Sequence, residues 1–476
     1  MSRLAPPRKK PVGPAPRARR RQPAPAVSPA TRTWIEKTLL ALSKRKVQRW
    51  ARQTGFVQRR QQLKPFDFLM LMVFAHLASI APSLEAMVAH LDHPISRVAL
   101  HYRFTRAARQ FLWTCLEGIL HHSQLIQSAL QTRCLQPFAH VWIHDSSSWD
   151  LPPALQKTFA GSGGSASPAN CKLQLSYELK QGRFAPPQLT AGKNPDQASW
   201  PHWVDQVQPQ DLVLIDLGFF SLRFFAAIAA QPAYFLSRFL VGTQLCSADT
   251  LKPFSLHPVL KKALGPAYQQ PVLMGTDLRL SCRLIALRAP ELIAQRRRRQ
   301  LRKTAKKKGR TPSQPQLDLC AWTVLVTNAP EALLPASQVR TFYRLRWQIE
   351  LIFKQFKSIL RIHHCRTKNP QRLLCELYGK LIAAVLVHSL AGQIQAELWN
   401  RQGQQLSFDK FWKRFQERAL LFFRASLLSL SQFLRSFLRE LPQLLKACLK
   451  CRQPSRPTSL ELLDIVEHLN FEAMPI

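Results

Sequence analysis

Acidic residues are scarce in this chain of 476 residues. There are 27 aspartates and glutamates against 68 lysines and arginines, which gives a formal net charge of +41 and an isoelectric point near 10.9. Solubility alone does not require so large an excess of positive charge. The excess predicts a polyanionic partner, and nucleic acid is the simplest one. A membrane surface is the competing interpretation.

The sequence also lacks a long uninterrupted apolar run. The best candidate, residues 381–387, ends at His388, whereas a membrane-spanning helix needs roughly 20 apolar residues. The first residues lack the apolar segment of a secretory signal. We therefore expect no membrane partner and a cytoplasmic protein.

Cysteines are present, but the paired spacing of a zinc ribbon is missing. Only Cys448 and Cys451 form a CxxC, and no second pair accompanies them. A lone pair on an apolar helix is better interpreted as two packed thiols. The run His363-His364-Cys365 is expected on a basic surface or against DNA. The scattered cysteines predict a reduced protein without structural disulfides.

The pattern of apolar residues changes along the chain and predicts four regions. Residues 1–32, rich in proline, alanine and arginine, are expected to be a disordered basic tail. Residues 33–125 predict a helical DNA-binding domain. Residues 136–400 predict a catalytic domain that a β-rich insertion interrupts at about 242–335. Residues 401–476 predict a C-terminal helical region.

The first half of the expected catalytic domain alternates between strand and helix patterns. Strands are expected at 139–143, 172–179, 184–190, 211–216 and 234–240, and helices at 199–207 and 220–230. The resulting order, β-β-β-α-β-α-β, is that of the RNase H-like fold and predicts the α/β class. In that fold the first carboxylate lies on the first strand and the second at the end of the fourth. Asp145 and Asp216 occupy these positions.

The insertion contains a strongly basic segment at 296–309. It lies between two expected strands, 283–287 and 322–326. Because its charges are not interleaved with aromatic residues, we expect a mobile, solvated segment that adds non-specific DNA affinity.

Residues 343–357 contain no glycine or proline and predict one continuous helix. At about 100° per residue, Tyr343, Arg346, Glu350 and Lys357 share one narrow face. An adjacent apolar stripe would seat this helix on a core. The stripe consists of Phe342, Leu345, Ile349, Ile352, Phe353 and Phe356. A carboxylate flanked by two cations and a phenol suits a site that holds a metal and a phosphodiester, although a surface helix with ordinary ion pairs is the competing interpretation.

Asp145, Asp216 and Glu350 are the candidate catalytic and metal-binding residues. Two Mg²⁺ ions about 3.5–4 Å apart can activate a water or a 3′-hydroxyl and stabilise the leaving oxygen, and carboxylates are the usual protein ligands of Mg²⁺. Taken singly, Asp145 could cap a turn with the serines that follow it, and Asp216 could begin a strand-to-helix turn. Asp150 is a rival for the first position. Together, their order along the chain favours catalysis.

The spacing Tyr-x2-Arg-x3-Glu-x6-Lys resembles the signature of the YREK group of DDE transposases, the bacterial insertion-sequence family four. The resemblance extends over about residues 51–364. It includes Ala51–Phe56, Ile143–Ser147, Ile215–Phe219, Phe235–Phe239 and Trp322–Thr327. The family often has Gly-Thr or Thr-Thr after its first aspartate, where this chain has two serines.

The resemblance implies a cut-and-paste DNA transposase of the bacterial cytoplasm, associated with the nucleoid. Such an enzyme would bind terminal inverted repeats as a homodimer, nick the ends with two Mg²⁺ ions, for which Mn²⁺ can substitute, and join the 3′-hydroxyls to target DNA. The resemblance also implies that Tyr343, Arg346 and Lys357 contact DNA. Trp322 matches a tryptophan on which a flipped base stacks in relatives that release through a hairpin, and a core tryptophan is its competing interpretation.

Two other functions share part of this pattern. An RNase H-like metal-dependent nuclease without transposition would use the same acids. A non-catalytic DNA-binding remnant of an element would need only the basic charge, but the three intact acids argue against such decay.

Overall fold

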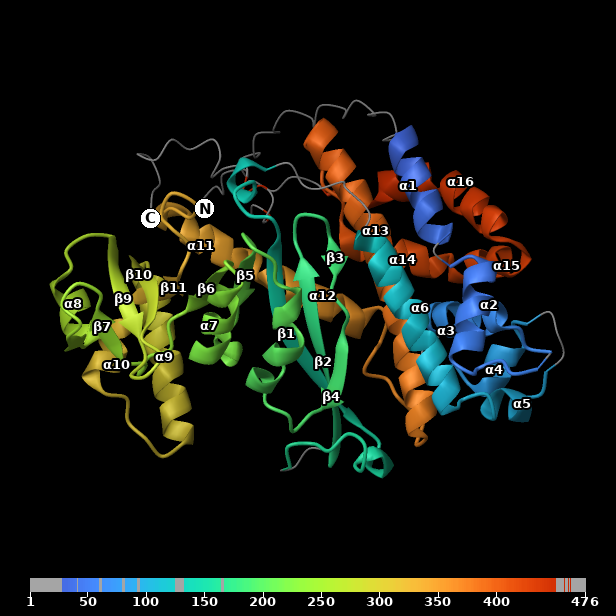
Figure 1. The fold of residues 1–476 in the computed structure, drawn as a ribbon, viewed down its shortest axis with the longest axis horizontal. Helices are drawn as coiled ribbons and strands as arrows, with labels where there is room; N and C mark the ends of the chain where they lie inside the picture. The colour runs from blue at the N-terminus through green and yellow to red at the C-terminus, as the bar shows by residue number, and fades with distance from the viewer. Residues whose placement is uncertain are drawn as a thin grey trace, which may run out of the picture.

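The structure, a computed structural model, describes most of the chain. The described residues are 28–40, 42–59, 62–78, 82–91, 95–124, 132–163 and 167–450, together with 458, 461 and 463. They form three parts along the long axis of the molecule: the insertion, the central sheet and a helical body (Figure 1). Most of the expected basic tail and Cys451 lie outside the described residues, and helix α1 begins at Pro29.

One mixed sheet runs through the catalytic domain and its insertion, in the order β3-β2-β1-β5-β6-β11-β10-β9-β7-β8, with β4 also paired to β2. The catalytic strands are β1 (Val141–Leu151), β2 (Ala169–Glu178), β3 (Arg183–Phe184), β4 (Gln188–Ala191), β5 (Leu212–Ile215) and β6 (Tyr234–Arg238). Strand β1 is antiparallel to β2 and parallel to β5, and β5 is parallel to β6. Helix α7 (Leu222–Ala230) connects β5 to β6. This is the RNase H-like topology that the sequence predicted.

The insertion extends the same sheet instead of forming a separate one. Its strands are β7 (Leu245–Ser247), β8 (Pro253–Phe254), β9 (Ala267–Met274), β10 (Leu280–Arg288) and β11 (Trp322–Thr327). Strand β11 pairs antiparallel with β6, with Leu325 opposite Arg238. Because β5 and β6 are parallel, the beginning of β11 lies at the edge where both of them end.

The basic segment of the insertion is a helix, so the expectation of a mobile segment is wrong. Helix α9 (Glu291–Lys307) follows β10, and α8 (Leu256–Lys262) and α10 (Gln314–Leu319) lie near it (Figure 1). Arginine, lysine, glutamine and alanine are all good helix formers. Arg297 also donates hydrogen bonds to the carbonyls of Cys320 and Trp322, which ties α9 to β11.

Two other expected elements differ in detail. The expected helix at 199–207 is a series of short 3-10 turns, Asp196–Ala198, Trp200–His202 and Val204–Gln206. Pro201 lies within the second turn and lacks the amide donor that a longer helix would need. The strand expected at 184–190 is divided into β3 and β4.

The N-terminal and C-terminal helices pack together around one long helix, α13 (Pro370–Gln402). The N-terminal helices are α1 (Pro29–Leu40), α2 (Lys44–Gln53), α3 (Pro65–Ala78), α4 (Leu84–Val88), α5 (Arg97–His101) and α6 (Arg106–Gln124), and the C-terminal helices are α14 (Phe408–Glu417), α15 (Ala419–Leu428) and α16 (Leu430–Cys448). Helix α3 crosses α13 closely, because a Cβ atom built on Gly379 would lie 2.4 Å from the carbonyl oxygen of Met72. Glycine at this crossing allows the two backbones to touch.

Helix α13 also corrects the expectation that no segment is long enough to span a membrane. By length and composition alone α13 is long and apolar enough to cross a membrane. However, 94% of its most apolar window is buried inside the protein. Its apolar side chains therefore form the core of the helical body. The nine described cysteines are free thiols, as predicted.

His388, in the middle of α13, joins three parts of the fold. Its Nδ1 accepts a hydrogen bond of 3.1 Å from Trp412 Nε1 of α14. The rings of Phe184 in β3 and Phe356 pack against the imidazole. Burial lowers the pKa of His388 to about 3, so the ring is neutral in the folded protein.

In the unfolded chain His388 takes up a proton near its ordinary pKa of 6.5. Above pH 6.5 the ring is neutral in both states, so its titration costs the folded protein no stability. As the pH falls from 6.5 toward 3, only the unfolded chain binds this proton, and the folded state loses stability. We expect the free energy of unfolding to decrease less steeply in His388→Gln than in the wild type, by up to about 1.4 kcal/mol per pH unit. Urea unfolding followed by circular dichroism between pH 7.5 and 4.5 measures this difference. His101→Gln, at an exposed position on α5, is the matched control. Equal slopes in the wild type and His388→Gln would contradict the assignment.

Candidate active site

The three candidate acids come from three different elements. Asp145 lies within β1, opposite Leu175 of β2. Asp216 is the first residue after β5, and its carboxylate accepts a hydrogen bond of 3.3 Å from the amide of Gly218. Glu350 lies in the first turn of helix α12 (Trp347–Ser358). The strand register and the crossing helix therefore determine how the acids meet.

The predicted helix over 343–357 is two helices that meet at Arg346. Helix α11 (Ala336–Leu345) ends there and α12 begins. The amide of Arg346 donates to the carbonyl of Tyr343 at 3.2 Å, and the amide of Ile349 donates to that of Arg346 at 3.3 Å. These i to i−3 bonds tighten one turn in the manner of a 3-10 helix. The predicted apolar stripe is buried along both helices, which confirms the expected seating.

The guanidinium of Arg346 contacts all three acids. Its Nη2 lies 2.7 Å from Glu350 Oε1, its Nη1 3.3 Å from Asp145 Oδ2, and its Nε 3.4 Å from Asp216 Oδ1. The contact with Asp216 is an ion pair without hydrogen-bond geometry. Arg346 has only 14% of its side chain exposed, so water screens these contacts weakly. The structure thus brings the three predicted acids together around one side chain.

Burial and charge act in opposite directions at this centre. Burial, with contributions from Asp216 and Glu350, raises the pKa of Asp145 to about 6, while the amide of Ser146 and the guanidinium of Arg346 oppose the rise. Burial acts to lower the pKa of Arg346, but the carboxylates outweigh it and the pKa is raised. With all groups ionised, three carboxylates and one guanidinium leave a local charge of −2 (−3 + 1). Arg346 alone therefore does not neutralise the three carboxylates.

Tyr343 lies beside Arg346, whereas Lys357 lies farther along β1 from the acids. The guanidinium carbon of Arg346 is 5.9 Å from the centre of the Tyr343 ring. The hydroxyl of Tyr343 is buried and interacts with the guanidinium of Arg346. Burial raises its pKa to about 12, so the phenol keeps its proton. Lys357 Nζ donates to the carbonyl of Ser148 at 3.2 Å, three residues along β1 from Asp145.

Asp150, the rival for the first acid, lies away from this centre. It is exposed, and its carboxylate accepts a hydrogen bond of 3.0 Å from the Asn170 amide. The contacts that Arg346 makes within the described part of the chain do not include it. The geometry therefore favours Asp145.

Two groups near the acids, Arg238 and Asp196, were not predicted as part of the site from the sequence. Ile215 pairs with Ser237 in parallel register, so Arg238 follows on β6 as Asp216 follows on β5. A basic residue at the end of the neighbouring parallel strand was the available signal. Asp196 accepts hydrogen bonds from Ser146 Oγ at 2.8 Å and Lys172 Nζ at 2.9 Å, which orients the residue after Asp145. No local pattern could predict that contact, because it joins residues 50 positions apart.

Trp322 is buried, with 7% of its side chain exposed. The guanidinium of Arg288 lies 4.6 Å from the centre of its ring. The indole also forms part of the wall of a cavity of about 360 Å³, which Arg238, Phe239 and Arg297 line as well. Trp322 therefore packs as a core residue and also borders a cavity next to the end of β6.

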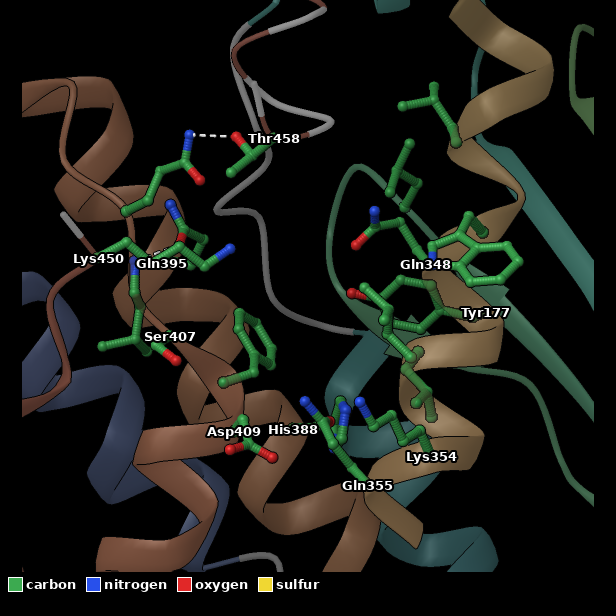
Figure 2. A pocket seen from close by; sticks show the side chains of 18 of the residues that line it. Tyr177, Gln348, Lys354, Gln355, His388, Gln395, Ser407, Asp409, Lys450 and Thr458 are labelled. Carbon is green, nitrogen blue, oxygen red and sulfur yellow. Dashed lines mark hydrogen bonds between the residues drawn. The ribbon is translucent and has the colours of Figure 1, made fainter. Parts of the chain in front are cut away.

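A cleft of about 1100 Å³ lies between α12 and the C-terminal helices. Figure 2 shows Lys354 on one wall and Ser407 and Asp409 on the other. Trp347, which has 55% of its side chain exposed, and Arg346 also line it. The cleft therefore borders Arg346 from the side of α12.

The donor atoms fit Mg²⁺, which prefers carboxylate oxygens and keeps several waters. In this structure, oxygens of Asp145, Asp216 and Glu350 each face a different nitrogen of the Arg346 guanidinium, which lies among them. In the described ranges, no group of three or more histidine, cysteine, aspartate or glutamate side chains is spaced to hold an ion. The same carboxylates could hold the predicted metals once Arg346 turns away.

Comparison with known proteins identifies the family. Residues 136–386, more than half of the chain, match the family described as Transposase DDE domain. The chain belongs to the DDE transposase family. The match begins just before β1 and ends within α13, so it includes all three acids.

Several insertion-sequence transposases are similar to this DDE transposase over most of its length. The transposase of element IS231B from Bacillus thuringiensis subsp. berliner is 27% identical, covering 88% of this chain and 92% of that protein. The transposase of IS1151 from Clostridium perfringens is 26% identical, covering 89% and 94%. The putative transposase InsL of IS186A from Escherichia coli K12 is 36% identical, covering 71% and 89%. These relatives confirm a transposase of the insertion-sequence type.

A solved structure of the piggyBac transposase synaptic complex with hairpin DNA is also similar. It is 10% identical with a TM-score of 0.44, covering 89% of this chain and 86% of that one.

Proposed function

We propose that this transposase cleaves the ends of its element by metal-dependent phosphodiester hydrolysis and joins the resulting 3′-hydroxyls to target DNA. The observation that supports this chemistry is the convergence of Asp145, Asp216 and Glu350, from three elements, on the guanidinium of Arg346. The protein would act at the nucleoid, as a homodimer assembled on the terminal inverted repeats.

The two steps are displacements at phosphorus. In the first, a water oxygen bonds to phosphorus, the bond to the 3′-oxygen breaks, and that oxygen takes up a proton to become the 3′-hydroxyl. In the second, this hydroxyl oxygen bonds to a target phosphorus, and the target 3′-oxygen leaves. Two bound Mg²⁺ ions would activate the attacking oxygen and stabilise the leaving one.

The side chains of the protein bind and orient the reacting groups. Asp145, Asp216 and Glu350 would hold the metals. Arg346 and Lys357, with the Tyr343 hydroxyl, would bind the phosphates on either side, because guanidinium and ammonium donors form strong charge-assisted hydrogen bonds to phosphate. Arg238, at the end of β6, is suited to the same task.

Recognition of the inverted repeats is assigned to the N-terminal helices. Helix α2 exposes Arg45, Lys46, Arg49 and Arg52, and Tyr102, just after α5, has 75% of its side chain exposed. A basic surface with an exposed aromatic residue suits contacts to phosphates and base edges. The catalytic centre then needs only to bind the phosphate that is cut.

Asp145→Asn, Asp216→Asn and Glu350→Gln should each reduce Mg²⁺-dependent nicking to background, because each removes one metal ligand, while DNA binding persists. The substrate is a labelled duplex from the DNA that flanks the gene, where inverted repeats bracketed by short direct duplications mark the element ends. Asp150→Asn is the matched control and should nick normally. Loss of nicking in Asp150→Asn with normal nicking in Asp145→Asn would overturn the assignment and with it the proposed centre.

Loss of phosphate contacts should weaken DNA binding evenly across sequences and flatten its salt dependence. For Arg346→Ala combined with Lys357→Ala we expect the slope of log K against log salt to fall by up to about 2, close to one unit per contact. Fluorescence anisotropy with end duplex and random duplex at several salt concentrations measures this slope. Arg435→Ala with Arg439→Ala, both exposed on α16, removes the same charge elsewhere. An unchanged slope in the first pair counts against a phosphate role.

The exposed charges of α9, together with residues 1–27, should drive non-specific affinity and leave the chemistry unaffected. Since α9 is anchored through Arg297, the test replaces only the exposed Arg296, Arg299, Arg302 and Lys306 with glutamine, in a chain without residues 1–27. The dissociation constant for random duplex at physiological salt should rise about tenfold or more. Nicking of a saturated end substrate should be retained. Unaltered binding of random duplex rejects this role.

Trp322 should act after the first nick if a base stacks on it in the cavity. Unpairing a terminal base costs a few kcal/mol, and an aromatic platform returns about 1–3 kcal/mol per stacked base. Trp322→Ala should therefore nick at a near-normal rate and accumulate nicked ends, whereas Trp322→Phe should proceed to release. Gel analysis of the products over time separates the steps. If Trp322→Ala unfolds or fails at the first nick, Trp322 is only a core residue.

A further inference from the structure

Arg346 lies among the three acids that would hold the catalytic metals. Each of its three guanidinium nitrogens faces a different acid, at distances between 2.7 and 3.4 Å. A single ion pair with Glu350, four residues away on the same helix, would be ordinary for a helix surface. Contacts with Asp145 and Asp216 as well, from two separate strands, are not explained by helix spacing.

We propose that Arg346 is the cation that holds the catalytic acids together in the absence of DNA, and that it must turn away to a DNA phosphate before metal ions bind. Metal binding and DNA binding would then be coupled through this one side chain. The inference rests on the proposed function, because it assumes that these acids are the metal ligands.

The three acids repel one another when all are ionised. Arg346 offsets this repulsion in a partly buried site. A divalent ion needs the same carboxylate oxygens as ligands. An arginine side chain remains protonated under all ordinary conditions and has no lone pair with which to bind a metal. Arg346 and the metals therefore compete for Asp145, Asp216 and Glu350.

A DNA phosphate provides the exchange partner that Arg346 needs. The planar guanidinium matches phosphate as well as it matches carboxylate, so turning to a phosphate keeps the charge paired. The neighbouring hydroxyl of Tyr343 is buried and protonated, and it interacts with Arg346. It is a hydrogen-bond donor positioned beside Arg346 for the same phosphate.

Thermodynamic linkage relates the affinity for metal to the affinity for DNA. If DNA raises the affinity for metal by some factor, metal raises the affinity for DNA by the same factor, and such coupling factors are typically about 5–150. A protein without DNA would bind metal poorly. Hydrolysis would then depend on DNA reaching the centre, and the metal alone would not prepare the site.

The decisive measurement is Mn²⁺ binding to the full chain, with free Mn²⁺ followed by electron paramagnetic resonance. Without DNA, Arg346→Gln should bind Mn²⁺ at least about tenfold more tightly than the wild type, a factor within the usual range of coupling. Arg344→Gln removes the same charge from an exposed position two residues away and should match the wild type. Adding a duplex that carries the element end should tighten Mn²⁺ binding by the wild type and leave Arg346→Gln nearly unchanged.

A second variant keeps the test decisive if Arg346→Gln fails to fold, which thermal melting by circular dichroism reports. Arg346→Lys keeps the charge but has a single nitrogen in place of a fork, so it should reach fewer acids and bind Mn²⁺ more tightly than the wild type. Equal or weaker Mn²⁺ binding by the folded variants overturns the proposal. Tight Mn²⁺ binding by the DNA-free wild type overturns the coupling and leaves the proposed function standing. Absence of Mn²⁺ binding in every form, with and without DNA, overturns both.

Discussion

The apolar stripe that seats α11 and α12 on the sheet is the interaction on which the catalytic centre depends. Phe342, Ile349 and Phe356 are fully or almost fully buried along these helices. Burying such side chains contributes about 1.5–3 kcal/mol each. With this face buried, the adjacent face has one possible orientation, and it directs Arg346 and Glu350 toward the strands that carry the aspartates. A helix rotated by one residue would turn Glu350 by about 100° away from them.

The chain as a whole is strongly basic, whereas its catalytic centre is rich in acids. Over the whole chain, the net charge of +41 attracts DNA from any direction. At the centre, three carboxylates outnumber one guanidinium. A cluster of acids in a basic protein suits an enzyme that must hold both a polyanion and divalent cations, because the acids would hold the cations and the basic side chains would bind the phosphates.

The insertion contributes to the site because it continues the same sheet. Pairing of β11 with β6 places the beginning of the insertion strand at the edge where β5 ends at Asp216. Arg238 lines the cavity next to Trp322, and its charge acts on both Tyr343 and Arg297. The insertion is therefore a lateral extension of the catalytic surface, and α9 adds its basic charge to that side.

Local patterns in the sequence determined the class of fold, the strand that carries Asp145, the strand end at Asp216 and the buried stripe beside Glu350. These features depend on residues close together in the chain, where periodicity and spacing are sufficient. Only the tertiary structure decided the rest. The break at Arg346 allows a predicted phosphate-binding arginine to reach two aspartates 201 and 130 residues earlier in the chain, and α9 is ordered by a contact with β11. The long helix α13 was not predicted as one element. Helices from both ends of the chain pack against its apolar surface, and this packing is not visible in the local sequence. Each of these outcomes depends on contacts between distant segments, and such contacts form only when the sheet brings those segments together.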